Sequence, residues 1–184
     1  MIIFLNGPSS SGKTSIAKKL QAIWNEEPCM HYSIDTFIKS FPKGLIDNAE
    51  LCRSFLPKVL SAYHTSIATI ASYGINIIVD HILQEESWLE QCVKVLKDYT
   101  VLFVGVKCPL KILEDRERKR KVLTLKGVRY QFERIHSYAE YDMEVDTSAM
   151  NVKECAQKIK DYLLSNRNPR AFLILQERLY VRRS

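Results

Sequence analysis

The chain alternates strand-like apolar runs with longer segments whose apolar residues recur at helical spacing. The runs cover residues 2–5, 29–34, 75–80 and 100–106, and the first, IIFL, is continuously apolar, like a strand buried on both faces of a sheet. Helical spacing is found in segments 16–24, 54–73 and 86–97. Strands that alternate with helices predict an α/β fold in three layers, with helices on both faces of a parallel sheet.

The segment before the C-terminus completes this pattern. MEVD at 143–146 is a short strand candidate, and Asn151 with Glu154 forms a capping pair that opens a helix reaching Leu163. A chain of 184 residues, 46% of them hydrophobic, is large enough to form one hydrophobic core. We therefore expect a single domain over residues 1–165, followed by a basic tail, 166–184, whose structure the pattern does not predict.

The chain shows no sign of export or of a membrane span. No apolar run approaches the roughly 20 residues that a bilayer requires, and Met1 leads directly into a strand instead of a signal peptide. Its five cysteines are odd in number, far apart and without a C-x-x-C pair. These features predict a cytoplasmic protein whose cysteines are reduced and form neither disulfides nor a metal site.

Residues 7–14 read GPSSSGKT, which is the phosphate-binding loop pattern G-x-x-x-x-G-K-T. The strand before it and the helix after it stand where the motif requires them. Lys13 is expected to neutralise the β- and γ-phosphates of ATP, and the Thr14 hydroxyl to help hold Mg²⁺. The predicted nucleotide-binding residues of this loop are Gly7, Ser9, Ser10, Ser11, Gly12, Lys13, Thr14 and Ser15.

Titratable residues stand where the second and third strands end. Ligands gather at the carboxyl ends of parallel strands, so Asp35, Asp80 and His81 should converge near the loop. Asp35 can accept or orient the proton of an attacking hydroxyl, and capping a helix that starts at Thr36 is a compatible alternative. Asp80 can bind magnesium through water or orient the acceptor, or else serve as a cap or turn residue. His81 can contact the acceptor, or else be a hydrogen-bonded structural residue.

Positive charge is concentrated in one segment. Residues 116–129 hold seven basic side chains against Glu117 alone, and this excess equals the net charge of +6 of the chain. Arg116 and Arg120 lie one helical turn apart, so a mobile lid near 114–130 could close over the nucleotide, with Arg120 stabilising the transferring phosphoryl group. A solvated charged helix is the alternative. Because the rest of the chain is close to neutral, nucleic acid is not the expected partner.

The basic tail carries a smaller cluster of arginines. Our default interpretation is a terminus that is solvated or contacts a partner.

These residues together resemble the chloramphenicol phosphotransferase family of P-loop kinases. The resemblance runs from Met1 to about Leu164 and rests on GPSSSGKTSI, SIDTFIKSFP, IIVDHIL, VGVKCPLKILEDRERKR and YDMEVDTSAMNVKECAQKI. It implies a nucleoside-monophosphate-kinase-like P-loop fold, with ATP and magnesium as donor and a hydroxyl of a small molecule as acceptor. By this resemblance Asp35 falls on the catalytic base and Arg120 on a lid arginine. The loop beside the adenine falls on Asp146, Thr147 and Ser148.

The chain departs from the family pattern at two places. Family members commonly carry R-G-D-R in the lid, where this chain has Arg120-Lys121-Val122-Leu123, so that Leu123 replaces the second arginine. Substitutes for that arginine could be Lys121, Lys126 or Arg129. The segment after Phe41-Pro42 is shorter than in the antibiotic-modifying members, so chloramphenicol is not assumed to be the acceptor.

The leading hypothesis is an ATP-dependent O-phosphotransferase that acts on a small hydroxylated compound, with Asp35 as the base. A nucleotide or nucleic-acid end kinase is the second enzymatic hypothesis, suggested by the positive charge. A third is a non-catalytic ATP-binding regulatory module. Asp35 favours an enzyme over a module that only binds ATP, since such a module needs no carboxylate facing the γ-phosphate.

Overall fold

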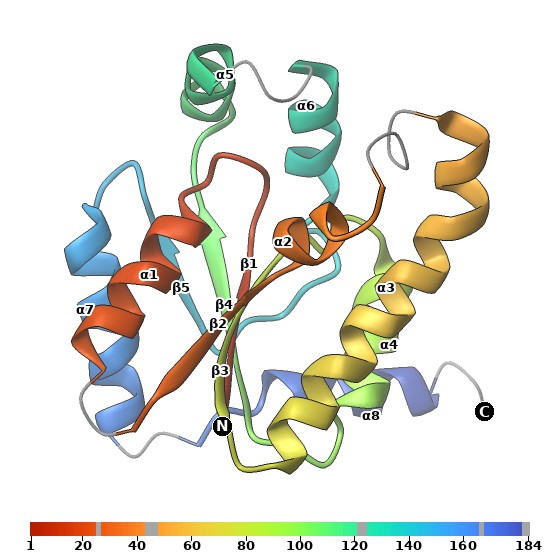
Figure 1. Cartoon of the computed structure of the whole chain (residues 1–184). Coiled ribbons are helices and arrows are strands. Elements are labelled where there is room, and N and C mark those ends of the chain that lie inside the picture. The colour runs from red at the N-terminus through yellow and green to blue at the C-terminus, as the bar shows by residue number, and fades with distance from the viewer. Residues whose placement is uncertain (25–26, 43–47, 121–124, 166–167, 182–184) are drawn as a thin grey trace.

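A five-stranded parallel sheet forms the centre of the molecule (Figure 1). The computed structural model describes residues 1–24, 27–42, 48–120, 125–165 and 168–181. The strands lie in the order β2-β3-β1-β4-β5, and all neighbours are parallel. Their bounds are β1 Ile2–Asn6, β2 Cys29–Ser33, β3 Asn76–His81, β4 Val101–Lys107 and β5 Met143–Asp146. The predicted strands and the α/β class are confirmed.

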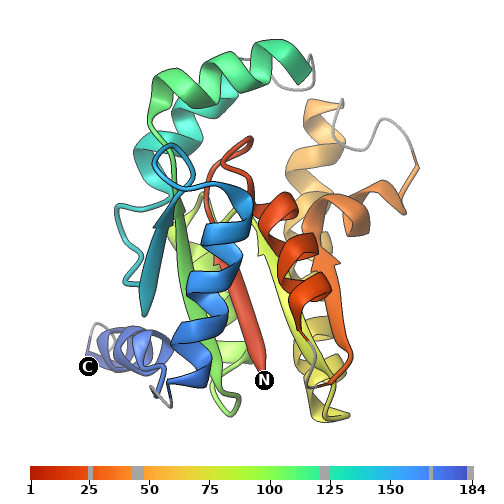
Figure 2. The same cartoon turned by 90° about the vertical axis from the view of Figure 1, so that its left-hand side faces the viewer.

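Helices cover both faces of this sheet, and two more stand above its carboxyl edge (Figures 1 and 2). On one face lie α1 and α7, and on the other lie α3, α4 and α8, while α5 and α6 form the upper part of the molecule. The bounds are α1 Lys13–Ile23, α2 Ile34–Lys39, α3 Ala49–Ser72, α4 Glu86–Val95, α5 Leu110–Arg120, α6 Leu125–Arg134, α7 Val152–Leu164 and α8 Ala171–Val181. The sheet is therefore the middle one of three layers.

Packing on both faces of β1 explains why its first four residues, Ile2 to Leu5, are all apolar. Ile2 and Phe4 belong to the core cluster that packs under α3, α4 and α8. Ile3 and Leu5 belong to the cluster between the sheet and the helices α1 and α7. Since successive side chains of a strand point to opposite faces, both faces of β1 must be apolar when both are covered.

Helix α3 begins earlier than its apolar periodicity predicts. The expected helix began at residue 54, whereas the helix starts at Ala49, where the Asn48 side chain accepts a hydrogen bond from the Leu51 amide at 2.9 Å. Leu51 itself is 45% exposed, so the first turns bury no apolar stripe from which they could be predicted.

At α7 the predicted capping pair is confirmed, because Asn151 and Glu154 form a reciprocal capping box.

The end of the chain folds into a helix that the sequence pattern did not predict. The backbone amides of Arg170 and Ala171 both donate to Asp142 Oδ1, at 2.6 and 2.8 Å, which satisfies the amino end of α8. Phe172 packs against Phe103 and Phe4, with ring centroids 5.2 and 6.0 Å apart. Helix α8 thus contributes Ala171, Phe172 and Leu175 to the core.

The helices above the sheet have a small core of their own. Cys108, Leu113 and Val128 are buried together, with partly buried neighbours from α5 and α6 around them. All five cysteines are free, and four of them, Cys29, Cys92, Cys108 and Cys155, are buried. Among the described segments, no helix is long and apolar enough to cross a membrane.

Candidate active site

The phosphate loop connects β1 to α1 with a backbone that requires glycine at both ends. A Cβ atom at Gly7 would lie 2.5 Å from the Val106 carbonyl oxygen, so β4 passes too close for any side chain there. Gly12 has φ +98°, which favours glycine, and it directly precedes the first residue of α1. Ser10, with φ 59°, is the non-glycine residue in the left-handed region among those described. Such a loop directs successive amides toward an anion at the helix N-terminus.

Lys13 is buried inside this loop. Its Nζ donates to the Pro8 carbonyl oxygen at 2.9 Å, which holds the ammonium group against the loop backbone. Burial lowers the pKa of Lys13, and the nearby carboxylates of Asp80 and Asp35 only partly oppose that effect. A buried cation with acidic neighbours is suited to meet the charge of a phosphate group.

Asp80 lies in β3 at the floor of the site. In the strand register it is opposite Ser33 of β2 and Leu5 of β1. Thr14 Oγ1 donates to Asp80 Oδ2 at 2.6 Å. Burial tends to raise the pKa of Asp80, but His31, the Lys13 ammonium and the Thr14 hydroxyl together hold it below the ordinary value. Asp80 is therefore an ionised strand residue, and the alternative of a cap or turn residue is wrong.

His31 is a site residue that the sequence analysis missed. Its Nε2 lies 3.6 Å from Asp80 Oδ2, within ion-pair distance, and its side chain is 14% exposed. The signal in the sequence was its position in β2, where alternation places it on the same face as Ser33. Only the pairing of β2 with β3 brings it to Asp80.

Asp35 lies in the first turn of α2 and is exposed. The N-cap of this helix is Ser33, so the alternative that Asp35 caps a helix starting at Thr36 is wrong. A carboxylate in the first turn is favoured by the positive end of the helix dipole. Its side chain is thus available to a ligand.

One pocket joins the loop to the carboxylates and to the lid. Arg120, the last residue of α5, is among the residues that line this pocket. The remaining lining residues come from the loop, from the first turn of α1, from α2, from β3 and from the residue that follows β3. In full, the pocket is lined by Ser9, Ser10, Gly12, Lys13, Thr14, Ser15, Ile34, Asp35, Asp80, Ile82 and Arg120.

Arg116 lies between the loop and the end of β5. Its guanidinium donates to the Ser10 carbonyl oxygen at 3.1 Å and to Oγ1 and the carbonyl oxygen of Thr147 at 3.0 and 2.9 Å. Thr147 Oγ1 in turn donates to the Ser11 carbonyl oxygen at 2.8 Å. Beside it, the amide and hydroxyl of Ser148 donate to Asp146 and lower the pKa of its carboxyl group. The alternative of a solvated charged helix is therefore wrong for Arg116.

His81 is buried and points away from the pocket. Its Nδ1 accepts a hydrogen bond from the Ile82 amide at 2.7 Å, so the ring proton resides on Nε2 and is shared with His64 Nε2 at 2.8 Å. His64 Nδ1 then donates to Gln91 Oε1 at 2.8 Å. Burial lowers the pKa of His64 to about 4 and that of His81 well below its usual value, so both rings are neutral. The structure thus places His81 in the core.

Cys92 lies beside this histidine pair, close enough for the three groups to resemble a metal site. However, Nδ1 of His81 is already an acceptor, so ligation through Nε2 would leave that ring without a proton. The arrangement is better described as a satisfied hydrogen-bond chain.

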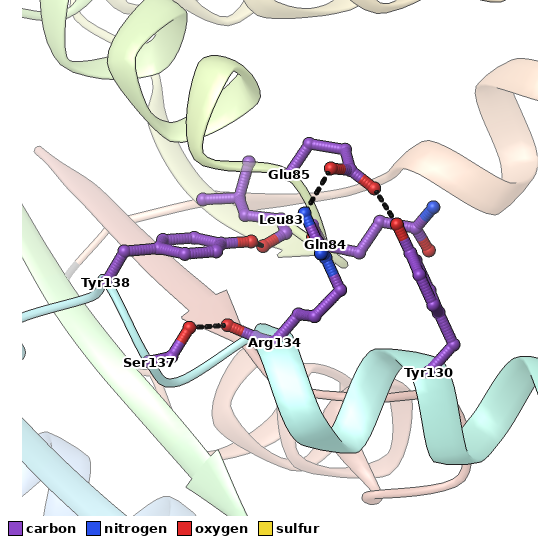
Figure 3. A network of polar contacts seen from close by, with 7 residues as sticks. All are labelled: Leu83, Gln84, Glu85, Tyr130, Arg134, Ser137 and Tyr138. Carbon is purple, nitrogen blue, oxygen red and sulfur yellow. Dashed lines mark hydrogen bonds and ion pairs between the residues drawn. The ribbon is translucent and has the colours of Figure 1, made fainter.

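The loop from Ile82 to Glu85 follows β3 and is held by α6 (Figure 3). Arg134 and Tyr130 both donate to the Glu85 carboxylate, at 2.8 and 2.7 Å, and the Tyr138 hydroxyl donates to the Leu83 carbonyl oxygen. Gln131, also in α6, accepts a hydrogen bond from the Ser9 amide at 2.9 Å. These contacts connect the phosphate loop, the lid and the chain beyond Asp80, and no sequence motif indicated them.

Part of the predicted lid chemistry lies outside the described residues. This applies to Lys121, to Leu123 and to the side chain of Lys126. Arg129 pairs with Glu114 of α5 at 2.9 Å, so in this structure it connects α6 to α5 and does not line the pocket.

The fold and the site together define the class of protein. A parallel sheet in the order 2-3-1-4-5, a phosphate loop after its first strand, and an arginine of α5 in the pocket that this loop lines are the features of P-loop phosphotransferases with a nucleoside-monophosphate-kinase-like fold. The chain belongs to the chloramphenicol phosphotransferase-like protein family, which it matches over residues 1–164. Helix α8 lies beyond this match.

A relative is found in Mycobacterium tuberculosis (strain ATCC 25618 / H37Rv). It is named "Putative O-phosphotransferase Rv2636" and is 29% identical over 205 residues, which cover 96% of this chain and 88% of the relative. The correspondence therefore extends through nearly the whole chain.

Solved structures of several kinases share the fold. A sugar kinase from Janibacter sp. HTCC2649 has a TM-score of 0.68 at 17% identity, covering 88% of this chain and 93% of the other. The Mycobacterium tuberculosis APS kinase CysC, in complex with AMPPNP and APS, has 0.66 at 18%, covering 88% and 96%. Shikimate kinase from Aquifex aeolicus has 0.60 at 15%, covering 90% and 98%. At these identities the likeness shows the fold alone.

Proposed function

We propose that this chain is an ATP-dependent O-phosphotransferase that moves the γ-phosphate of ATP to a hydroxyl group of a small molecule. The observation that carries the proposal is the pocket in which Lys13 and Thr14 meet Asp35, Asp80 and Arg120. A module that only binds a nucleotide would need the loop and its lysine. The exposed carboxylate of Asp35 and the guanidinium of Arg120 are the additional groups that phosphoryl transfer uses.

The residues present fit a magnesium nucleotide. Positive φ angles at Ser10 and Gly12 shape the loop into an anion-binding concavity, and the buried Lys13 supplies a positive charge inside it. The hydroxyl of Thr14 and the carboxylate of Asp80 are oxygen ligands of the kind that Mg²⁺ prefers, used directly or through water. A bound magnesium nucleotide would supply the phosphoryl group that is transferred.

Asp35 and Arg120 have complementary roles in this proposal. Asp35 accepts or orients the proton of the acceptor hydroxyl from its exposed position in the first turn of α2. Arg120 stabilises negative charge on the transferring phosphoryl group, as lid arginines do in phosphoryl transfer. Asp80 keeps its negative charge and holds Thr14 in position.

The acceptor is expected on the side of the pocket formed by α2 and the chain beyond β3. Ile34 and Ile82 line that side together with Asp35. Apolar side chains beside a carboxylate suit a small hydroxylated compound with an apolar part. His81 plays no direct part, because its side chain is buried against His64.

The test is a measurement of magnesium-dependent ADP release across hydroxylated antibiotics, nucleosides and sugars. The expected result is an acceptor that stimulates ADP release in the wild type and far less in Asp35→Asn. Phosphorylated product is then identified by mass spectrometry. A wild-type protein that does not bind ATP in the presence of magnesium would overturn the proposal, and a preference for nucleic-acid ends would favour the second hypothesis.

A further inference from the structure

Helix α5 carries a buried acidic residue, Glu117, whose side-chain hydrogen bonds within the described part of the chain are all with the phosphate loop. The side chain is 1% exposed although it lies in a helix rich in charge. Its Oε1 accepts hydrogen bonds from Ser9 Oγ at 2.6 Å and from Ser10 Oγ at 2.7 Å. Hydrogen bonds to an ionised acceptor are shorter and stronger than neutral ones, and both distances fall in that range.

The contact is made at the strained part of the loop. Ser10 has φ 59°, in the left-handed region that a non-glycine residue adopts only when its surroundings enforce it. Glu117 holds the Ser10 side chain, while Arg116 donates to the Ser10 carbonyl oxygen at 3.1 Å. Neighbouring residues of one helix thus hold the side chain and the backbone of the same loop residue.

The same helix places Arg120 at the pocket. Arg120 follows Glu117 by three residues, which is slightly less than one helical turn, so the two positions move together. Arg120 lines the pocket and Glu117 does not. We call the hydrogen bonds from Ser9 and Ser10 to Glu117 the clamp. The clamp fixes the distance between α5 and the phosphate loop, and that distance determines how far Arg120 reaches into the pocket.

Stability alone does not explain a carboxylate at this position. The second oxygen, Oε2, is buried and has no hydrogen-bond partner among the described residues. An unsatisfied oxygen on a buried charged group costs free energy. The arrangement therefore lowers stability while it fixes the geometry of the loop and the lid, as expected of a group retained for function.

We infer that Glu117 is a positioning residue. It binds the lid helix to the phosphate loop, keeps Ser10 in its left-handed conformation, and thereby aligns Arg120 before the nucleotide arrives. The role of Arg120 rests on the proposed function, whereas the clamp itself is a property of the protein without ligand. The two parts can therefore be tested separately.

The clamp is tested by hydrogen exchange in the ligand-free protein. Glu117→Gln has the same shape but a weaker acceptor, so amides in residues 8–12 and 110–120 should exchange at least about tenfold faster than in the wild type. Peptides from β1 and β4 should not change. Unchanged exchange in both segments would overturn the inference, whether or not the protein binds a nucleotide.

The alignment of Arg120 is tested by a double-mutant cycle on binding of a non-hydrolysable ATP analogue with magnesium. Glu117→Gln should weaken binding about tenfold in the wild-type background and less than about threefold in Arg120→Ala. The melting temperature of Glu117→Gln should stay equal or rise, because a buried charge is removed. Equal losses in both backgrounds would refute action through Arg120.

Matched variants complete the experiment. Asp115→Asn changes an exposed carboxylate of the same helix that pairs with Arg118, and it should alter neither exchange nor binding. If Glu117→Gln failed to fold, Ser9→Ala would remove one donor of the clamp and leave the carboxylate in place. Ser9→Ala should then accelerate exchange of residues 110–120 by a smaller factor, and no acceleration would overturn the inference.

Discussion

Asp80 and His81 are consecutive residues of β3, yet their side chains lie on opposite sides of the sheet in contrasting environments. Asp80 faces Thr14, Lys13 and the pocket, whereas His81 faces the buried ring of His64. For both residues the pKa lies below its ordinary value. The consequence is opposite, since a lowered pKa keeps an acid charged and a base neutral at pH 7.

The causes differ as well. The pKa of Asp80 falls although burial opposes its charge, because His31, Lys13 and Thr14 outweigh that penalty. The pKa of His81 falls mainly because burial disfavours its charged form. On the pocket side, Asp80 therefore stays charged although burial opposes its charge. On the core side, both histidines are neutral and each of their ring nitrogens has a hydrogen-bond partner. Variants on the pocket side should change function, and variants on the core side should change stability.

The largest effect is expected from Lys13→Ala, which removes the positive charge inside the loop. Transfer should fall by more than about 10³-fold and ATP binding should weaken, because no other cation lies within the loop backbone. Activity and calorimetric binding are the measurements. Lys18→Ala, which changes an exposed lysine of the same helix, is the matched control and should have no effect. Near-normal turnover of Lys13→Ala would refute a pocket-side role for this lysine.

Asp35→Asn should lower the transfer rate by roughly 10²- to 10⁴-fold while ATP affinity survives, as expected for a positioned general base. A smaller loss would indicate that Asp35 orients the hydroxyl, since loose phosphoryl-transfer transition states need little base assistance. Stability should decrease by less than about 1 kcal/mol, through the weaker interaction with the α2 dipole. Full activity with unchanged binding would remove Asp35 from the chemistry.

Arg120→Ala should lower kcat by on the order of 10²-fold if its guanidinium stabilises the transferring phosphoryl group. Single-turnover kinetics separates this effect from product release. Arg118→Ala changes an exposed arginine two residues earlier that pairs with Asp115, and it should leave kcat unchanged. A change in thermal stability alone would make Arg120 a structural residue and would weaken the contrast between the two sides.

His64→Gln should have the smallest effect on turnover and a pH-dependent effect on stability. The pKa of His64 is about 4 in the folded protein, below its ordinary 6.5, so the unfolded chain binds more protons between these values. The free energy of unfolding of the wild type should therefore rise as the pH increases from about 4 to 6.5, by up to about 3 kcal/mol from this group.

The measurement is chemical unfolding at several pH values for the wild type and for His64→Gln. Glutamine does not titrate, so the rise should be smaller in the variant, and the difference should be constant above pH 6.5. Parallel curves over the whole range would contradict a neutral, buried His64. Loss of ATP binding in His64→Gln would show that the core side is not independent of the pocket side.

Much of this fold could be predicted from local patterns because each pattern has a direct physical cause. The apolar run of β1 reflects burial on both faces, and GPSSSGKT combines the positive φ of Gly12 with the close approach of Gly7 to β4. The capping box at Asn151 is likewise complete within four residues. The φ angle of Gly12 and the capping box depend on neighbours in the sequence. The apolar run and Gly7 depend on distant segments, but the residue types themselves reveal burial on both faces and close packing, so the sequence is sufficient to predict all four features.

Tertiary structure alone decided the contacts between distant segments. His31 reaches Asp80 through the pairing of β2 with β3, and Glu117 reaches Ser10 across more than a hundred residues. Helix α8 is satisfied at its start by Asp142, a residue far earlier in the chain. Asp80 and His81 are both polar and adjacent in the sequence. Because successive side chains of a strand point to opposite faces, Asp80 is a charged site residue and His81 is a neutral core residue. The charge of a buried group depends on the side chains and the solvent around it, and these surroundings form only when the chain folds.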